Sequence, residues 1–241
     1  MSPDPDTDSI ASRVALVQAR IDAACAAAGR PRSSVRLLAA TKTRTPEEIA
    51  ECVLAGVDLV GENRAQELRD KHEAVAAAMP AGHPAPEWHF IGALQRNKVK
   101  YVVGRAVLVH AVDSLKLGEE LSARALELGE PIGVLVEVNT GGEQSKAGVP
   151  PEQALDLARA LQALPGLRLR GLMTIPPDVP EPRPYFQRLA ELAAQGRDQG
   201  LPLDELSMGM SGDLEAAIDS GATIIRVGTA LFGPRRARPA P

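Results

Sequence analysis

A lysine at the end of an apolar run has a residue type and a position suited to chemistry. Alternate side chains of a strand lie on one face, so Leu38, Ala40 and Lys42 share a face at the end of the segment 35–41. If that face lines a barrel, Lys42 projects into the mouth of the barrel. A desolvated lysine has a lowered pKa, and its amine is then a nucleophile that forms Schiff bases. On position alone, a lysine that reaches solvent or pairs with a neighbouring strand is the simpler interpretation.

Two glycine-containing segments near the end of the chain are suited to binding an anion. "SMGMSGDLEAAI" (207–218) places Ser211 between an expected strand and a helix, where free backbone amides and a hydroxyl group bind anions. "RVGTALFG" (226–233) places Gly228 and Thr229 directly after the last expected strand. An ordinary helix cap explains Ser211 alone. Because the loops after the last two strands of βα barrels often hold a phosphate, the two segments together predict a phosphate site.

Three further polar residues follow or interrupt apolar runs. Arg226 lies inside "TIIRVG", where a guanidinium group is costly unless it finds an acceptor. That acceptor is either a carboxylate on another strand, with Glu137 as a candidate, or a ligand's ring nitrogen or carboxylate. Asn63 follows another strand, where it either contacts a ligand or caps the next helix. Lys146, in the loop 139–148, is expected to be an exposed surface lysine.

A lysine amine and a phosphate site at one barrel mouth indicate pyridoxal 5′-phosphate (PLP) as the cofactor. Lys42 would form the Schiff base, and Ser211, Gly228 and Thr229 would hold the phosphate. Arg226 would meet the ring nitrogen, and because an arginine does not give up its proton, that nitrogen would stay unprotonated. An unprotonated ring is a weaker electron sink, which favours limited chemistry or none. The four histidines and two cysteines have no metal-ligand spacing, so no metal site is expected.

Apolar runs of strand length alternate with segments of helical spacing along the chain. Strands are predicted at 35–41, 57–62, 88–94, 106–114, 132–139, 167–175, 204–210 and 223–228. Helices are predicted at 8–28, 46–55, 64–78, 95–103, 115–128, 151–163, 185–198 and 213–220. This alternation favours an α/β fold, a single (β/α)8 TIM barrel with an extra N-terminal helix that fills the eighth place. An open doubly wound sheet is the alternative, but its usual GxGxxG segment after the first strand is missing.

Composition limits the classes of protein that the chain can belong to. Its 241 residues fit one barrel domain, 1–241, with flexible tails expected at 1–8 and 234–241. The net charge of −4 gives no basic field for nucleic acid, and no apolar stretch approaches the roughly 18 residues of a membrane span. We expect that the acidic N-terminus is not a signal peptide and that the two cysteines are buried reduced thiols. We therefore expect a cytoplasmic protein.

Several of these segments carry a resemblance to a known family. "ATKTRTPEEI", "GENRAQE", "WHFIGALQRNK", "GLMTI", "LSMGMSGDLEAAI" and "RVGTALFG" together resemble the YggS/PROSC family of pyridoxal phosphate homeostasis proteins. That family looks like the N-terminal barrel of alanine racemase standing alone, and the resemblance covers roughly residues 10–233. It implies that Lys42 carries the cofactor, that Arg226 faces the pyridine nitrogen, and that Ser211, Gly228 and Thr229 hold the phosphate.

The resemblance also implies a function. It points to a protein that carries and buffers PLP and serves vitamin B6 and amino-acid homeostasis, without established catalytic turnover. Its partners would be PLP and apo-enzymes that depend on PLP, and we expect a monomer. Racemisation needs an acid–base group on each face of the reacting carbon, and the racemase takes its second group, a tyrosine, from a second domain that we do not expect here. The alternatives are a PLP-dependent amino-acid racemase or lyase, and a cofactor-free Schiff-base aldolase acting on a phosphorylated sugar.

Overall fold

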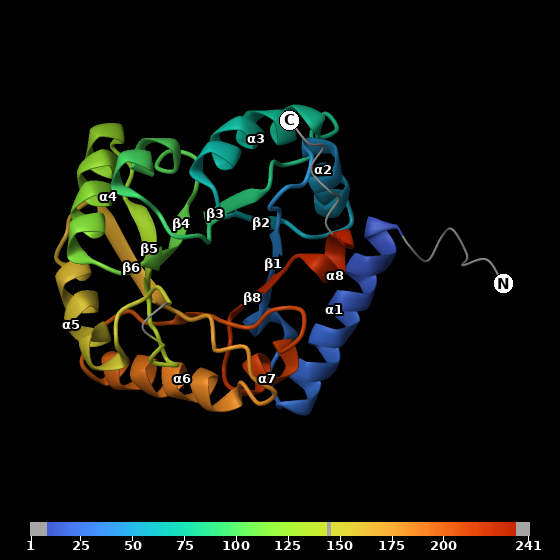
Figure 1. Cartoon of the computed structure of the whole chain (residues 1–241). Coiled ribbons are helices and arrows are strands. Elements are labelled where there is room, and N and C mark those ends of the chain that lie inside the picture. Colours follow the sequence, from blue (N-terminus) through green and yellow to red (C-terminus); the bar gives the residue numbers. More distant parts are fainter. Residues whose placement is uncertain (1–8, 144–145, 235–241) are drawn as a thin grey trace.

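Eight parallel strands form a closed barrel in the computed structural model, which describes residues 9–143 and 146–234. The strands follow one another around the barrel in chain order, and β1 pairs with β8 to close it (Figure 1). They are β1 (Arg36–Ala40), β2 (Leu59–Glu62), β3 (Glu87–Phe90), β4 (Leu108–Val112), β5 (Ile132–Glu137), β6 (Leu167–Met173), β7 (Glu205–Ser207) and β8 (Ile224–Val227). The prediction of a TIM barrel is confirmed, and the alternative of an open sheet is wrong.

Helices form a ring around the barrel (Figure 1). They are α1 (Ile10–Ala27), α2 (Pro46–Leu54), α3 (Ala65–Ala78), α4 (Leu115–Leu128), α5 (Pro151–Gln162), α6 (Arg183–Asp198), α7 (Leu214–Asp219) and α8 (Thr229–Phe232), with 3₁₀ helices η1 (Arg32–Ser34) and η2 (Arg96–Tyr101). The N-terminal helix α1 packs against α2, α7 and α8, so it fills a place in the ring as predicted. The helices η1 and α8 were not predicted.

One predicted α-helix is wrong. The segment expected to be a helix at 95–103 contains η2 instead, and its backbone bonds from Lys98 to Gln95 and from Val102 to Val99 span three residues. Three valines in nine residues explain the difference, because β-branched side chains crowd the preceding turn of an α-helix. The tails predicted at 1–8 and 234–241 lie outside the described residues, apart from Pro234.

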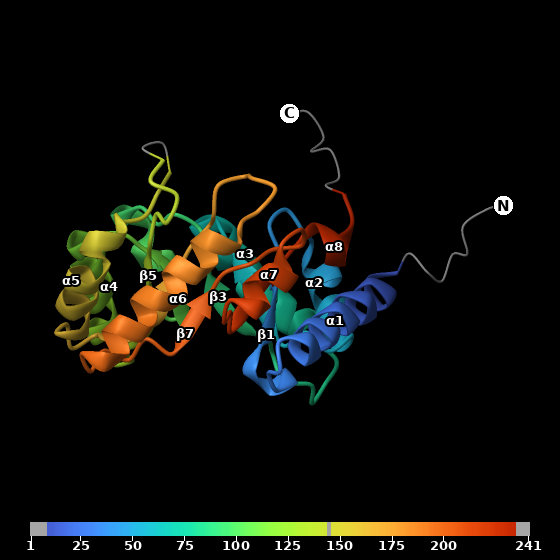
Figure 2. The ribbon, with the colours of Figure 1, turned by 90° about the horizontal axis from the view of Figure 1, so that it is seen from below.

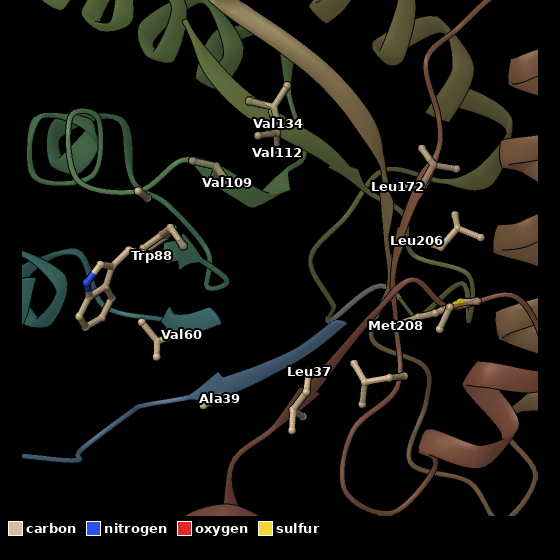
Figure 3. Packing of buried hydrophobic residues seen from close by; sticks show 14 of the residues in the cluster. Leu37, Ala39, Val60, Trp88, Val109, Val112, Val134, Leu172, Leu206 and Met208 are labelled. Carbon is tan, nitrogen blue, oxygen red and sulfur yellow. The ribbon is translucent and has the colours of Figure 1, made fainter. Parts of the chain in front are cut away.

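The strands separate two apolar regions. Leu37 and Ala39 of β1 belong to the larger region, which lies between the barrel and the helices (Figure 3). The smaller region fills the inside of the barrel with Leu38, Leu59, Leu108, Ala111, Leu135, Met173 and Ile224. Leu38 therefore faces inward, as the alternation predicted for the face that it shares with Lys42. Among the described residues, no helix is long and apolar enough to cross a membrane.

The carboxyl ends of the strands open onto one face of the barrel. The loops that follow β5 and β6 rise from this face (Figure 2). In α/β barrels the loops that follow the strands build the functional site, so this face is the first place to look for one.

Candidate functional site

A cavity of about 560 Å³ lies at the carboxyl ends of the strands. All six residues that the sequence analysis selected for binding line it: Lys42, Asn63, Ser211, Arg226, Gly228 and Thr229. Small residues make up much of the remaining wall, namely Ala40, Gly61, Gly92, Ala93, Ala111, Ala147 and Gly212. Segments far apart in the sequence thus meet around one space, as the barrel prediction required.

Lys42 lies in a tight turn between β1 and α2. The Arg44 amide donates to the Thr41 carbonyl across 3.0 Å, and Thr43 between them has a φ of 64°. A positive φ is strained for a β-branched residue and needs support from its surroundings. Part of that support comes from Glu67, whose carboxylate accepts a hydrogen bond from the Thr43 amide at 3.2 Å. The turn is therefore held from both sides, and it fixes where Lys42 enters the cavity.

The start of α2 fixes the far side of this turn. Thr45 caps the helix, because its hydroxyl accepts from the Glu48 amide at 3.3 Å while the Glu48 carboxylate accepts from the Thr45 amide at 2.9 Å. This reciprocal capping box and the proline at the first helical position end the loop at a defined residue.

A buried ion pair lies beneath the turn. Glu62, at the end of β2, is fully buried, and its carboxylate accepts from Lys71 Nζ at 2.5 Å and from the Thr41 hydroxyl at 2.9 Å. Lys71 also donates to the Thr41 carbonyl at 3.0 Å and to Glu67 at 2.9 Å. Burial raises the pKa of Glu62, and the charge of Lys71 opposes that rise. This support was not predicted, because it depends on contacts between β1, β2 and α3.

Arg226 enters the cavity from β8 and is 6% exposed. Its Nη1 donates to the Ser207 hydroxyl oxygen at 2.6 Å and its Nη2 donates to the Thr174 carbonyl at 3.0 Å. Among the described residues, no carboxylate forms an ion pair with it, so the strand-borne carboxylate considered in the sequence analysis does not pair with Arg226. Burial lowers the pKa of Arg226 to about 10, although the charges of Asp213 and Glu137 act in the opposite direction.

Glu137, at the end of β5, lines the same cavity and is 7% exposed. Burial raises the pKa of its carboxyl group to about 7; the charge of Asp113 adds to the rise and Arg226 opposes it. From the sequence, Glu137 was expected only as a candidate partner of Arg226. Its place at an inward-facing strand end was the available signal that it also belongs to the cavity.

Unused backbone donors gather at one side of the cavity. Within the described part of the chain, the amides of Ser211, Gly212, Gly228 and Thr229 donate to no acceptor. The Gly228 segment lies beside β1, because a Cβ atom on Gly228 would be in van der Waals contact with the Ala40 carbonyl oxygen at 3.4 Å. Gly209, with a φ of 91°, leaves no room for a Cβ atom beside Ala217. These donors lie in the two segments for which the sequence predicted an anion site, and the binding of an anion there stays a prediction.

Asn63 presents an acceptor that has no partner. Its Oδ1 is buried and forms no hydrogen bond. Helix α3 begins after Arg64 and has no side-chain cap, so the interpretation of Asn63 as a helix cap is wrong. An unsatisfied buried polar atom on a cavity wall is costly in isolation and indicates a site that a ligand or water completes.

Lys146 is less exposed than we expected. Its side chain is one-third exposed, and its Nζ donates to the Pro176 carbonyl at 2.9 Å and pairs with Glu143 at 2.9 Å. It therefore ties the loop after β5 to the loop after β6, near Ala147 of the cavity wall.

The chain resembles known proteins over almost its whole length. The family model of the alanine racemase N-terminal domain matches residues 13–236. A pyridoxal phosphate homeostasis protein of Aquifex aeolicus is 46% identical over 228 residues, which cover 93% of this chain and 97% of the relative. The protein of that name from Escherichia coli K12 is 40% identical over 236 residues, which cover 95% and 97%. The chain belongs to the family of pyridoxal phosphate homeostasis proteins.

Solved structures agree with this assignment to the homeostasis-protein family. A protein from Bifidobacterium adolescentis is 41% identical, with a TM-score of 0.89 and coverage of 96% of this chain and 98% of that one. PipY of Synechococcus elongatus, solved with PLP bound, is 34% identical, with a TM-score of 0.80 and coverage of 93% and 100%. Alanine racemase of Corynebacterium glutamicum is 17% identical with a TM-score of 0.66, and the match covers 97% of this chain and 63% of that one, which shows the shared barrel alone.

Proposed function

We propose that this chain binds PLP in the cavity at the carboxyl ends of the strands and holds it covalently through Lys42. The observation that carries the proposal is that Lys42, Arg226 and the free amides near Gly228 line one cavity of about 560 Å³. The names of the relatives and the PLP bound to PipY support it.

The residues present fit the chemical groups of this cofactor. Lys42 supplies the amine. Its nitrogen bonds to the aldehyde carbon, the aldehyde oxygen leaves as water with the two amine hydrogens, and a carbon–nitrogen double bond remains. The Ser211 hydroxyl and the amides of Gly228 and Thr229 supply neutral donors to the phosphate. The small residues around Lys42 leave room for a flat ring, and the orphaned Oδ1 of Asn63 accepts a hydrogen bond from a ligand or an intervening water.

The character of Arg226 favours a carrier over an enzyme. When bound, PLP supplies an aldehyde that condenses with amines and a ring that withdraws electrons from an attached amino acid. Arg226 only donates hydrogen bonds, so it binds the ring nitrogen without protonating it. Electron withdrawal is then weak. We propose that the protein stores PLP and delivers it to apo-enzymes, and so serves vitamin B6 and amino-acid homeostasis. We also propose that it acts as a monomer.

Catalysis on amino acids is the second candidate, and Glu137 is the observation that favours it. A carboxyl group with a pKa of about 7 in the cavity is suited to general acid–base work near neutral pH. Tyr101 and Tyr185 do not line the cavity, so within the described residues neither supplies the tyrosine that a racemase uses.

The two buried free cysteines, Cys25 and Cys52, suit a reducing compartment, and we propose the cytoplasm.

Titration with PLP tests the first candidate. Wild-type protein gains the visible absorbance of a lysine-bound aldehyde, and Lys42→Ala loses it. Lys116→Ala, at an exposed lysine of α4 outside the cavity, keeps it. A wild-type protein that stays colourless at saturating PLP contradicts the proposal.

Exchange of the α-proton in D₂O separates the two candidates. The PLP-loaded protein is incubated with a panel of amino acids, and deuterium incorporation is followed by NMR. A carrier gives no incorporation beyond that of free PLP at the same concentration. If wild type incorporates deuterium catalytically and Glu137→Gln does not, the protein is an enzyme instead.

A further inference from the structure

A line of polar side chains crosses the otherwise largely apolar interior of the barrel. Arg226 Nη1 contacts the Ser207 hydroxyl oxygen at 2.6 Å, and that oxygen lies 2.8 Å from His110 Nδ1. His110 Nε2 lies 2.8 Å from His89 Nδ1, and His89 Nε2 lies 2.9 Å from a carboxylate oxygen of Glu87. The three middle residues are almost fully buried. Four hydrogen bonds thus connect β8, β7, β4 and β3 across the barrel.

The two ends of this line lie in different cavities. Arg226 belongs to the cofactor cavity, whereas Glu87 and His89 line a second cavity of about 630 Å³. The first residues of β1, β3, β4, β5 and β7 line the second cavity, so it lies at the amino ends of the strands. Arg36 lies there too and donates to the same carboxylate oxygen of Glu87 at 3.1 Å. The line therefore joins the two ends of the barrel.

Each hydrogen bond of the line has a defined direction. An ionised Glu87 only accepts, so His89 donates through Nε2. Burial disfavours charge on both histidines, and a neutral histidine carries one ring proton. His89 Nδ1 therefore accepts from His110 Nε2, His110 Nδ1 accepts the Ser207 hydroxyl proton, and the Ser207 oxygen accepts from Arg226. Arginine only donates, so both ends require the same direction.

We propose that Ser207, His110 and His89 are positioning residues for Arg226, and that Glu87 is the remote anchor that sets the direction of their hydrogen bonds. Ser207 and the Thr174 carbonyl each hold one nitrogen of the guanidinium group, which leaves its remaining donors for the cavity. This inference rests on the proposed function, in which Arg226 binds the ring nitrogen of PLP. It adds that Glu87, which lies in the cavity at the amino ends of the strands, contributes to the affinity for PLP.

Histidine NMR of the PLP-free protein tests the line directly. The ¹⁵N shifts of wild type are expected to show both His89 and His110 as neutral Nε2–H tautomers. Glu87→Ala removes the final acceptor, so His89 is expected to become a mixture of tautomers. Glu87→Gln keeps an amide oxygen that accepts from His89 and restores the wild-type tautomer. Glu130→Ala, at an exposed carboxylate of the same cavity outside the line, changes neither ring.

Cofactor affinity tests the link to Arg226. Ser207→Ala is expected to raise the dissociation constant of PLP about fivefold, and Glu87→Ala about threefold, because each loses part of one hydrogen bond's contribution. Glu87→Gln and Glu130→Ala stay close to wild type. A merely structural role for Glu87 lowers stability without moving the histidine shifts.

The outcomes separate this inference from the proposed function. If wild type fails to bind PLP, the proposed function is wrong, whatever the histidine shifts show. If wild type binds PLP but Glu87→Ala changes neither the histidine tautomers nor the affinity for PLP, the proposed positioning of Arg226 through the histidines is wrong. The proposed cofactor site then still stands. An Nδ1–H tautomer or an imidazolium ring at either histidine of wild type also overturns the proposed positioning.

Discussion

At the residue scale, the cavity combines Glu137, a carboxyl group with a pKa near neutral pH, with Arg226, a cation held by neutral acceptors. Glu137 has a pKa of about 7 against its ordinary value of 4.5, because it is buried and faces the charge of Asp113. Between these two pH values the folded protein keeps a proton that the unfolded chain has lost. The contribution of this proton to stability is complete below about pH 4.5 and disappears as the pH rises through about 7.

Replacing Glu137 by glutamine is expected to remove this pH dependence. The free energy of unfolding of wild type falls between pH 5 and 8 relative to that of Glu137→Gln, by at most about 3 kcal/mol. Urea unfolding of the PLP-free proteins at several pH values measures the difference. Glu143→Gln, at a carboxylate that is 43% exposed, serves as the control and follows wild type. Parallel curves for wild type and Glu137→Gln contradict the assigned pKa.

Arg226→Lys tests the geometry of the cation at unchanged charge. A lysine cannot reach Ser207 and the Thr174 carbonyl while it also presents a flat donor pair to the cavity. We expect the dissociation constant of PLP to rise about tenfold, while the circular dichroism spectrum stays that of wild type. Equal affinity of the two proteins means that charge alone, and not the fixed guanidinium plane, matters at this position.

Residue type and position predicted residues that the fold brings to one cavity, while their binding roles stay predictions. Lys42 and Arg226 stand out because a cation next to or within an apolar strand needs a reason, and both line the cavity. The alternation of a strand gives the face of each residue, but not which inward polar groups meet across a barrel. Glu62 with Lys71, and the line from Glu87 to Ser207, were therefore not predicted. Those contacts depend on the registers of neighbouring strands, which local sequence does not contain.

At the element scale, the junction of β1, α2 and α3 holds Lys42 in place. The buried carboxylate of Glu62 is compensated by Lys71, which also bonds to the Thr41 carbonyl just before Lys42. Removing one partner of a buried pair leaves an uncompensated charge, which costs more than removing both. This junction therefore allows a clear test by a double-mutant cycle.

Lys71→Met is expected to destabilise the protein by about 3 kcal/mol, because it leaves Glu62 buried without a cation. Glu62→Gln combined with Lys71→Met is expected to recover part of that loss, because the uncompensated charge disappears. Denaturant unfolding of the two single variants and the double variant measures the coupling between the residues. Additive losses in the double variant would show that the pair does not act as a unit.

The elements themselves were predictable to the extent that their patterns were long and regular. All eight strands lie where apolar runs predicted them, although most are shorter at their ends. Most of the shortfall lies at the carboxyl ends, where the chain leaves the ladder, as after Phe90 and Ser207, but β2 ends where it was predicted to end and begins two residues later. The valine-rich segment that contains η2 was predicted wrongly as an α-helix. The spacing of its apolar residues is helical, but this spacing did not overcome the poor helix propensity of valine.

At the scale of the whole molecule, barrel closure brings distant segments to one cavity. β1 and β8 pair in register, with Leu38 opposite Arg226, and this pairing brings the Lys42 turn beside the Gly228 segment. Along the sequence, Lys42 and Gly228 are 186 residues apart in a chain of 241. The central claim is that the cavity formed in this way holds PLP through one lysine.

Borohydride reduction followed by peptide mass spectrometry tests that claim most directly. Reduction converts the carbon–nitrogen double bond into a stable single bond, so the modified lysine keeps its label through digestion. We expect PLP-loaded wild-type protein to carry a stoichiometric label on the peptide with Lys42 and other lysines to carry only traces. A stoichiometric label on another lysine, such as Lys146, or the absence of any label after saturation with PLP, would contradict it.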